Sequence, residues 1–111
     1  MLISIIGPMY NETELVFQFC NAVKKSLYNL HNTYDYEIIL VNDGSTDDTY
    51  DKMLIAQEND PLFVTVVNLT RNFGLEGAVK AGLQVAKGDI VIVMDADLQD
   101  PPQLIPRMVK K

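Results

Sequence analysis

The chain of 111 residues has little cysteine and no long apolar run, and each absence excludes a class of protein. Its one cysteine, Cys20, allows no internal disulfide, which is consistent with a reducing compartment. Because Cys20 lies among Phe17, Phe19 and Val23, we expect a small buried hydrophobic residue and not a nucleophile. No segment approaches the roughly 18–20 consecutive apolar residues that span a bilayer. With 48% hydrophobic and 22% charged residues, the composition is that of one globular domain.

Positive charge is also scarce. The net charge of −6 argues against a nucleic-acid-binding domain, because such domains need a basic face. The same negative charge opposes a phosphate-bearing ligand unless a bound cation compensates for it.

Two common phosphate-binding motifs are missing. No G-x-G-x-x-G follows the first apolar segment, which argues against a classical NAD or FAD domain. Gly77 and Gly82 have the spacing of a phosphate-binding P-loop. However, Leu83 and Gln84 stand where that loop requires Lys and Ser or Thr, and the segment has helical spacing. We therefore exclude a P-loop.

The chain does contain a regular alternation of strand and helix patterns. Apolar segments rich in β-branched residues predict strands at 2–6, 37–41, 63–68 and 90–94. Stripes of helical spacing lie between them at 15–30, 50–57 and 75–86, and a fourth helix is expected from Pro101. This alternation predicts an α/β fold, a Rossmann-like parallel sheet with helices on both faces. Right-handed crossovers and one reversal of direction predict the strand order 3-2-1-4.

Local signals predict where the helices begin and end. Asn11 and Ser45 are expected to be helix N-caps because an acidic residue follows each of them three positions later. Asp100 is expected to cap the fourth helix before Pro101. Gly88 follows the third helix where a left-handed C-cap is expected.

Polar residues gather after each predicted strand, at 8–12, 42–47, 71–74 and 95–100. In open parallel sheets, ligands bind beyond the carboxyl ends of the strands, near the point where the strand order reverses. We therefore expect the four polar segments to form one ligand site.

The acidic pair Asp95 and Asp97 is the most informative of these segments. Strand geometry would point both carboxylates to the same side, where they repel each other unless they share a proton or a cation. A hard divalent ion with oxygen ligands resolves this, and it also binds phosphate oxygens. Asp97 is the expected direct metal ligand and Gln99 can add an amide oxygen, whereas Asp95 reaches either a ribose or a metal-bound water. The alternative is two solvated carboxylates at a strand–loop junction.

The other segments offer groups for a nucleotide. Tyr10 has a flat apolar face for a base, and Asn11 or Glu12 can hydrogen-bond a base or ribose; the alternative is a helix cap beside an exposed tyrosine. Asp43 is needed neither for the turn at Gly44 nor for the cap, and its carboxylate can accept the N–H of uracil or guanine. Arg71 supplies a cation for phosphate, a counter-ion to the acidic residues, or a structural salt bridge.

Taken together, these segments resemble the nucleotide-binding half of family 2 glycosyltransferases of the GT-A fold. The matching stretches are 6–12, 37–47 and the Asp-x-Asp at 95–97. The stretches 71–74 and 95–102 are similar to those of polyprenyl-phosphate glycosyltransferases, which include dolichol-phosphate and undecaprenyl-phosphate enzymes. Asn42 and Gly7 depart from the pattern, since many relatives carry Asp and a β-branched residue at these positions.

The resemblance implies roles for individual residues. Those expected to bind the nucleotide of a UDP- or GDP-sugar are Pro8, Tyr10, Glu12, Asp43, Arg71, Asp95 and Ala96. Asp95, Asp97 and Gln99 are expected around a Mg²⁺ or Mn²⁺ ion on the diphosphate, with Asp95 and Asp97 as the catalytic pair. The implied reaction inverts the anomeric carbon: an oxygen of a polyprenyl phosphate attacks it and the nucleoside diphosphate leaves.

Further expectations concern the whole protein. Residues 1–111 are expected to be one nucleotide-sugar-binding domain, a soluble amino-terminal piece of a longer enzyme at the cytoplasmic face of a membrane. We expect this piece to bind nucleotide without transferring sugar, and to dimerise through the edge strand 90–94. The alternative function is a receiver-like phosphoacceptor domain, which would need an Asp after the third strand, where Asn68-Leu69-Thr70 stands.

Overall fold

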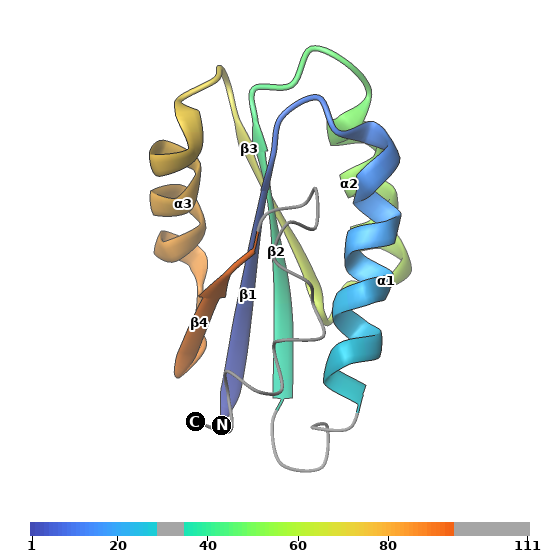
Figure 1. Cartoon of the computed structure of the whole chain (residues 1–111), viewed down its shortest axis with the longest axis vertical. Helices are drawn as coiled ribbons and strands as arrows, with labels where there is room; N and C mark the ends of the chain where they lie inside the picture. The colour runs from blue at the N-terminus through green and yellow to red at the C-terminus, as the bar shows by residue number, and fades with distance from the viewer. Residues whose placement is uncertain (29–34, 95–111) are drawn as a thin grey trace.

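The computed structural model describes residues 1–28 and 35–94 as a parallel sheet between two layers of helix (Figure 1). The strands are β1 (Leu2–Met9), β2 (Asp35–Asp43), β3 (Val64–Leu69) and β4 (Ile90–Val93). The helices are the short η1 (Thr13–Leu15), α1 (Val16–Leu27), α2 (Thr49–Asn59) and α3 (Gly74–Val85). The sheet order is β3-β2-β1-β4 with parallel pairing throughout, which confirms the predicted order. Helices α1 and α2 cover one face, and α3 covers the other (Figure 1).

Strand β1 is central and buried from Ile3 to Met9. Ile3 and Ile5 pack in the larger core cluster with Phe19 of α1, while Ile6 packs on the opposite face with Ala78 of α3. Because β1 has helices on both faces and strands on both sides, its sequence is apolar at successive positions instead of alternating.

Gly7 of β1 allows the close approach of α1. A Cβ atom at this position would lie 2.5 Å from Cε2 of Phe19, closer than packed atoms come. Gly7 therefore leaves room for the large aromatic side chain of Phe19.

The predicted helix caps are wrong. Asn11 has a left-handed φ of 50° and precedes η1, and α2 begins at Thr49, four residues after Ser45. Neither helix start has a side-chain cap hydrogen bond, because the Asn11 and Ser45 side chains bind a neighbouring loop instead. The predicted cap at Asp100 lies outside the described residues.

The prediction of a left-handed cap at Gly88 is also wrong, since α3 ends at Val85 and the next residue, Ala86, is extended. Gly88 instead allows a close approach, because a Cβ there would lie 2.4 Å from the Oγ of Ser4. Its N–H donates to Ser4 Oγ at 2.8 Å, and that hydroxyl donates to Glu37 Oε2 at 2.5 Å. Glu37 Oε2 also accepts the N–H of Lys87 at 2.8 Å. These bonds connect β1, β2 and the segment before β4 at the amino ends of the strands.

In the part of the chain that the structure describes, no helix is both long enough and apolar enough to cross a lipid bilayer.

Candidate functional site

The loops that follow β1, β2 and β3 meet at the carboxyl end of the sheet (Figure 1). There they enclose a pocket of about 300 Å³. Its lining residues are Pro8, Met9, Tyr10, Glu12, Asp43, Asn72, Gly74 and Leu75. The structure thus brings together the four residues expected to hold a base and ribose, which come from two different strand ends. Their role towards a ligand stays a prediction.

Asp43 has a structural role that the sequence did not reveal. Its side chain is buried, with 5% of its surface exposed, and Oδ1 accepts the backbone N–H of Phe73 at 2.8 Å. This bond ties the end of β2 to the loop between β3 and α3. A carboxylate has several acceptor positions, so Asp43 can bind Phe73 and still present an acceptor to the pocket that it lines.

Gly44 brings the same two segments into backbone contact. Its φ of +72° is unfavourable for other residues, and a Cβ atom would lie 2.2 Å from the carbonyl carbon of Arg71. The wall of the pocket that contains Asp43 and Asn72 is therefore fixed by one partly buried hydrogen bond and one backbone contact.

Arg71 lies beside the pocket but is not among the residues that line it. Its guanidinium carbon lies 4.5 Å from the centre of the Phe73 ring, a cation–π arrangement. Within the described ranges Arg71 has no ion pair, so the interpretation as a structural salt bridge finds no support there. The Arg71 side chain is exposed, and its role towards a phosphate stays a prediction.

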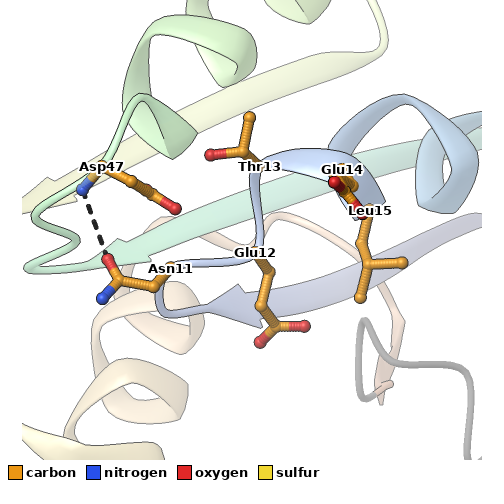
Figure 2. Close-up of a pocket in the computed structure, with 6 residues that line it drawn as sticks. All are labelled: Asn11, Glu12, Thr13, Glu14, Leu15 and Asp47. Atoms are coloured by element: carbon orange, nitrogen blue, oxygen red, sulfur yellow. Dashed lines mark hydrogen bonds between the residues drawn. The ribbon is translucent and has the colours of Figure 1, made fainter.

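A second pocket, of about 420 Å³, shares the residue Glu12 with the first one (Figure 2). Its lining residues are Asn11, Glu12, Thr13, Glu14, Leu15 and Asp47. Glu12 is therefore placed between the two sets of lining residues. In Figure 2 the Glu12 carboxylate points away from Asp47 and Thr13.

Two ionisable groups near these elements have shifted pKa values. Hydrogen bonds from the Thr49 side chain and backbone lower the pKa of Asp47, so the carboxylate stays ionised. Burial raises the pKa of Cys20 to about 11. A thiol that is protonated at neutral pH is a poor nucleophile, and Cys20 is buried in the core as expected.

The expected metal ligands Asp95, Asp97 and Gln99, together with Ala96, lie outside the described residues. Among the residues that the structure does describe, no group of three His, Cys, Asp or Glu side chains could hold a metal ion. The strand that leads to them ends close to the site, because the Met94 N–H donates to the Ile6 carbonyl at 2.9 Å.

The sequence did not single out Met9 and Leu75, which also line the pocket. Strand β1 extends three residues beyond its predicted end, to Met9, and Leu75 belongs to the first turn of α3. Met9, like Asn72 and Gly74, falls within a polar segment identified after a strand, whereas Leu75 falls outside these segments. The helical stripe that begins at Leu75 was a signal that this helix starts at the site.

Comparison with known proteins identifies the family. Residues 4–111 match the family described as glycosyl transferase family 2. An undecaprenyl-phosphate 4-deoxy-4-formamido-L-arabinose transferase of Serratia proteamaculans is 43% identical over 108 residues, which cover 97% of this chain and 32% of the relative. The putative glycosyltransferase CsbB of Bacillus subtilis is 44% identical over 109 residues, with 98% and 32% covered. The chain thus spans about a third of the length of these relatives.

Solved structures agree in fold. The mannosyltransferase PcManGT from Pyrobaculum calidifontis, in complex with GDP-Man and Mn²⁺, has a TM-score of 0.74 and 30% identity over 86% of this chain and 27% of its own. TarS 1-349 of S. aureus, in complex with UDP-GlcNAc, has a TM-score of 0.70 and 26% identity. The match covers 87% of this chain and 27% of the TarS chain. The receiver-like alternative finds no support in these matches. The parallel sheet is that of GT-A glycosyltransferases, and the chain belongs to glycosyl transferase family 2.

Proposed function

We propose that the 300 Å³ pocket binds the nucleotide of a UDP- or GDP-sugar, and that the enzyme transfers this sugar to a polyprenyl phosphate. The observation that carries the proposal is the convergence of Pro8, Tyr10, Glu12 and Asp43 at the carboxyl end of a parallel sheet, next to its central strand. This is the position where open α/β sheets bind ligands.

The pocket offers different chemistry to each part of a nucleotide. The Tyr10 side chain is 43% exposed, so its ring is accessible for stacking on a base. The Asp43 carboxylate accepts a ring N–H of uracil or guanine, and Glu12 accepts a hydrogen bond from a ribose hydroxyl. Arg71, stacked on Phe73, neutralises part of the charge of the diphosphate.

We further propose that Asp95, Asp97 and Gln99 hold Mg²⁺ or Mn²⁺, with Asp95 and Ala96 also next to the nucleotide. Carboxylate and amide oxygens suit a hard divalent ion. The end of β4 beside β1 and the Mn²⁺ in the PcManGT complex support this assignment. When bound, such an ion neutralises the charge that develops on the departing diphosphate.

The proposed acceptor is the phosphate of a polyprenyl lipid, as in the relatives named undecaprenyl-phosphate transferases. A phosphate oxygen forms the new bond to the anomeric carbon as the bond to the nucleoside diphosphate breaks, which inverts that carbon. Because this phosphate is already ionised at neutral pH, the reaction needs no dedicated general base. A lipid acceptor and a nucleotide-sugar donor place the reaction at the cytoplasmic face of a membrane.

The proposed dimer would form along β4. Val91 and Val93 are 38% and 41% exposed on this strand, and apolar strand edges recruit partners. Light scattering should detect a dimer that Val93→Lys weakens. A monomer at high concentration would contradict the dimer without affecting the proposed reaction.

A thermal-shift panel tests the function. UDP, GDP, CDP and TDP are added with and without Mn²⁺. A ligand present at 100 times its Kd adds about 2.7 kcal/mol to the free energy of unfolding. We expect UDP or GDP to stabilise the protein, and more so with Mn²⁺. Asp97→Asn should remove the metal-dependent part, and Asp43→Asn should reduce the remainder. No shift with any nucleotide would contradict the proposal.

A further inference from the structure

Asn11, between the pocket residues Tyr10 and Glu12, has a strained backbone and several hydrogen bonds. Its φ of 50° lies in the left-handed region, which is unfavourable for most side chains, although asparagine adopts it more readily than the others do. Its Oδ1 accepts the Thr46 N–H at 2.8 Å, and its own N–H donates to Ser45 Oγ at 3.0 Å. Its Nδ2 also lies 3.2 Å from Thr46 Oγ1. Figure 2 shows its carboxamide directed towards the Asp47 nitrogen.

The backbone of Glu12 is held from the same side. Its N–H donates to the Oγ1 of Thr49 at 3.0 Å. Thr49 is fully buried, and its hydroxyl donates in turn to Asp47 Oδ1 at 2.5 Å. The Thr49 hydroxyl is therefore fixed in orientation, with its lone pair available to the Glu12 N–H.

Neither Asn11 nor Thr49 lines the 300 Å³ pocket. Asn11 lies between the two residues that do, Tyr10 and Glu12, and Thr49 accepts the Glu12 N–H. Their hydrogen bonds connect this segment to the loop between β2 and α2 and to the first residue of α2. A strained φ persists where surrounding contacts over-determine it, and such strain is often found at binding sites.

We propose that Asn11 and Thr49 are positioning residues, which hold residues 10–12 in the conformation that binds the nucleotide. Preorganisation of this kind increases affinity because the ordering of the loop is complete before the ligand arrives. The inference rests on the proposed function of the pocket. It assigns part of the nucleotide affinity to residues that do not touch the ligand.

The test compares UDP and GDP affinity, measured by calorimetry with Mn²⁺, across matched variants. Asn11→Gly keeps the left-handed backbone accessible but removes the side-chain bonds, and we expect affinity to fall about tenfold. Thr49→Val should have a similar effect, and Thr49→Ser, which keeps the hydroxyl, should restore affinity. Ser4→Ala is the control, because it removes hydrogen bonds at the opposite end of β1 and should lower stability alone.

The outcomes separate the inference from the function on which it depends. Unchanged affinity in Asn11→Gly and Thr49→Val would overturn the inference while the pocket remains a nucleotide site. Equal losses in Thr49→Ser and Thr49→Val, or an equal loss in Ser4→Ala, would show a general effect of stability and also overturn it. If the wild-type chain binds neither UDP nor GDP, the proposed function fails and the inference fails with it.

Discussion

At the amino ends of the strands, hydrogen bonds of Ser4 and Glu37 connect β1, β2 and the segment before β4. At the carboxyl ends, hydrogen bonds of Asn11 and Asp43 connect the loops around a pocket. Both ends use the same chemistry, a side-chain oxygen that accepts backbone N–H groups from a segment distant in sequence. At the amino end, Glu37 Oε2 accepts two donors and joins β1, β2 and the segment before β4. At the carboxyl end, Asp43 accepts one donor and lines the pocket.

We propose that this difference separates stability from binding in the fold. A carboxylate whose hydrogen bonds are all made within the protein contributes to stability alone. A carboxylate such as Asp43, which makes one internal bond and borders a cavity, can serve both purposes. The predictions below test this separation, from the largest expected effect on stability to the smallest.

The backbone contact at Gly44 should be the most sensitive point. Gly44→Ala adds both an unfavourable φ and a clash with the Arg71 backbone, and we expect a loss of about 3 kcal/mol in the free energy of unfolding. Gly74→Ala is the matched control, because Gly74 also has a positive φ, +85°, but nothing lies within 4 Å of its added Cβ. It should lose about 1 kcal/mol in urea denaturation. Equal losses of stability in the two variants would show that the close approach at Gly44 has no effect of its own.

Asp43 should affect stability and binding together, and Glu37 stability alone. Asp43→Ala leaves the Phe73 N–H without its partner, which should cost about 1–3 kcal/mol and also abolish nucleotide binding. Asp43→Asn keeps an acceptor for the Phe73 N–H, so its free energy of unfolding should be close to that of wild type. Its nucleotide affinity should still be reduced at least about tenfold. Glu37→Ala should cost similar stability and leave affinity unchanged. A loss of affinity in Glu37→Ala would break the separation of the two ends.

Asp47 should make the carboxyl end sensitive to acid. Because the hydrogen bonds from Thr49 lower its pKa in the folded state, Asp47 stabilises the fold above its unfolded pKa of about 4. This contribution is lost as the pH falls through the folded pKa. The effect should be the smallest of the three, because the side chain is exposed. Urea midpoints at pH 7 and pH 3 should differ more for wild type than for Asp47→Asn, and equal differences would contradict this.

The strand order and four of the pocket residues could be predicted because both follow from repeated patterns. Apolar strands alternate with helical stripes, and polar residues follow each strand. Pro8, Tyr10, Glu12 and Asp43 could therefore be grouped before any coordinates were known. The identity of their ligand was predicted from resemblance and stays a prediction.

The connections between loops could not be predicted, because they depend on distances between segments far apart in sequence. Asn11 bonds to residues more than 30 positions away, although its local pattern is that of a helix cap. An asparagine can cap a helix or adopt a left-handed turn, and the sequence alone does not distinguish the two. The prediction of a helix cap at Gly88 is wrong for the same reason, since its hydrogen-bond partner, Ser4, is 84 residues away.

The central claim is that the carboxyl end of the sheet binds a nucleotide and the amino end does not. An NMR titration of the ¹⁵N-labelled chain with UDP and with GDP, each with Mg²⁺, tests it directly. The amide signals of Tyr10, Glu12 and Phe73 should shift with one of the two, while those of Lys87 and Gly88 should stay in place. Shifts at Lys87 and Gly88 without shifts at Tyr10, Glu12 and Phe73 would contradict the account.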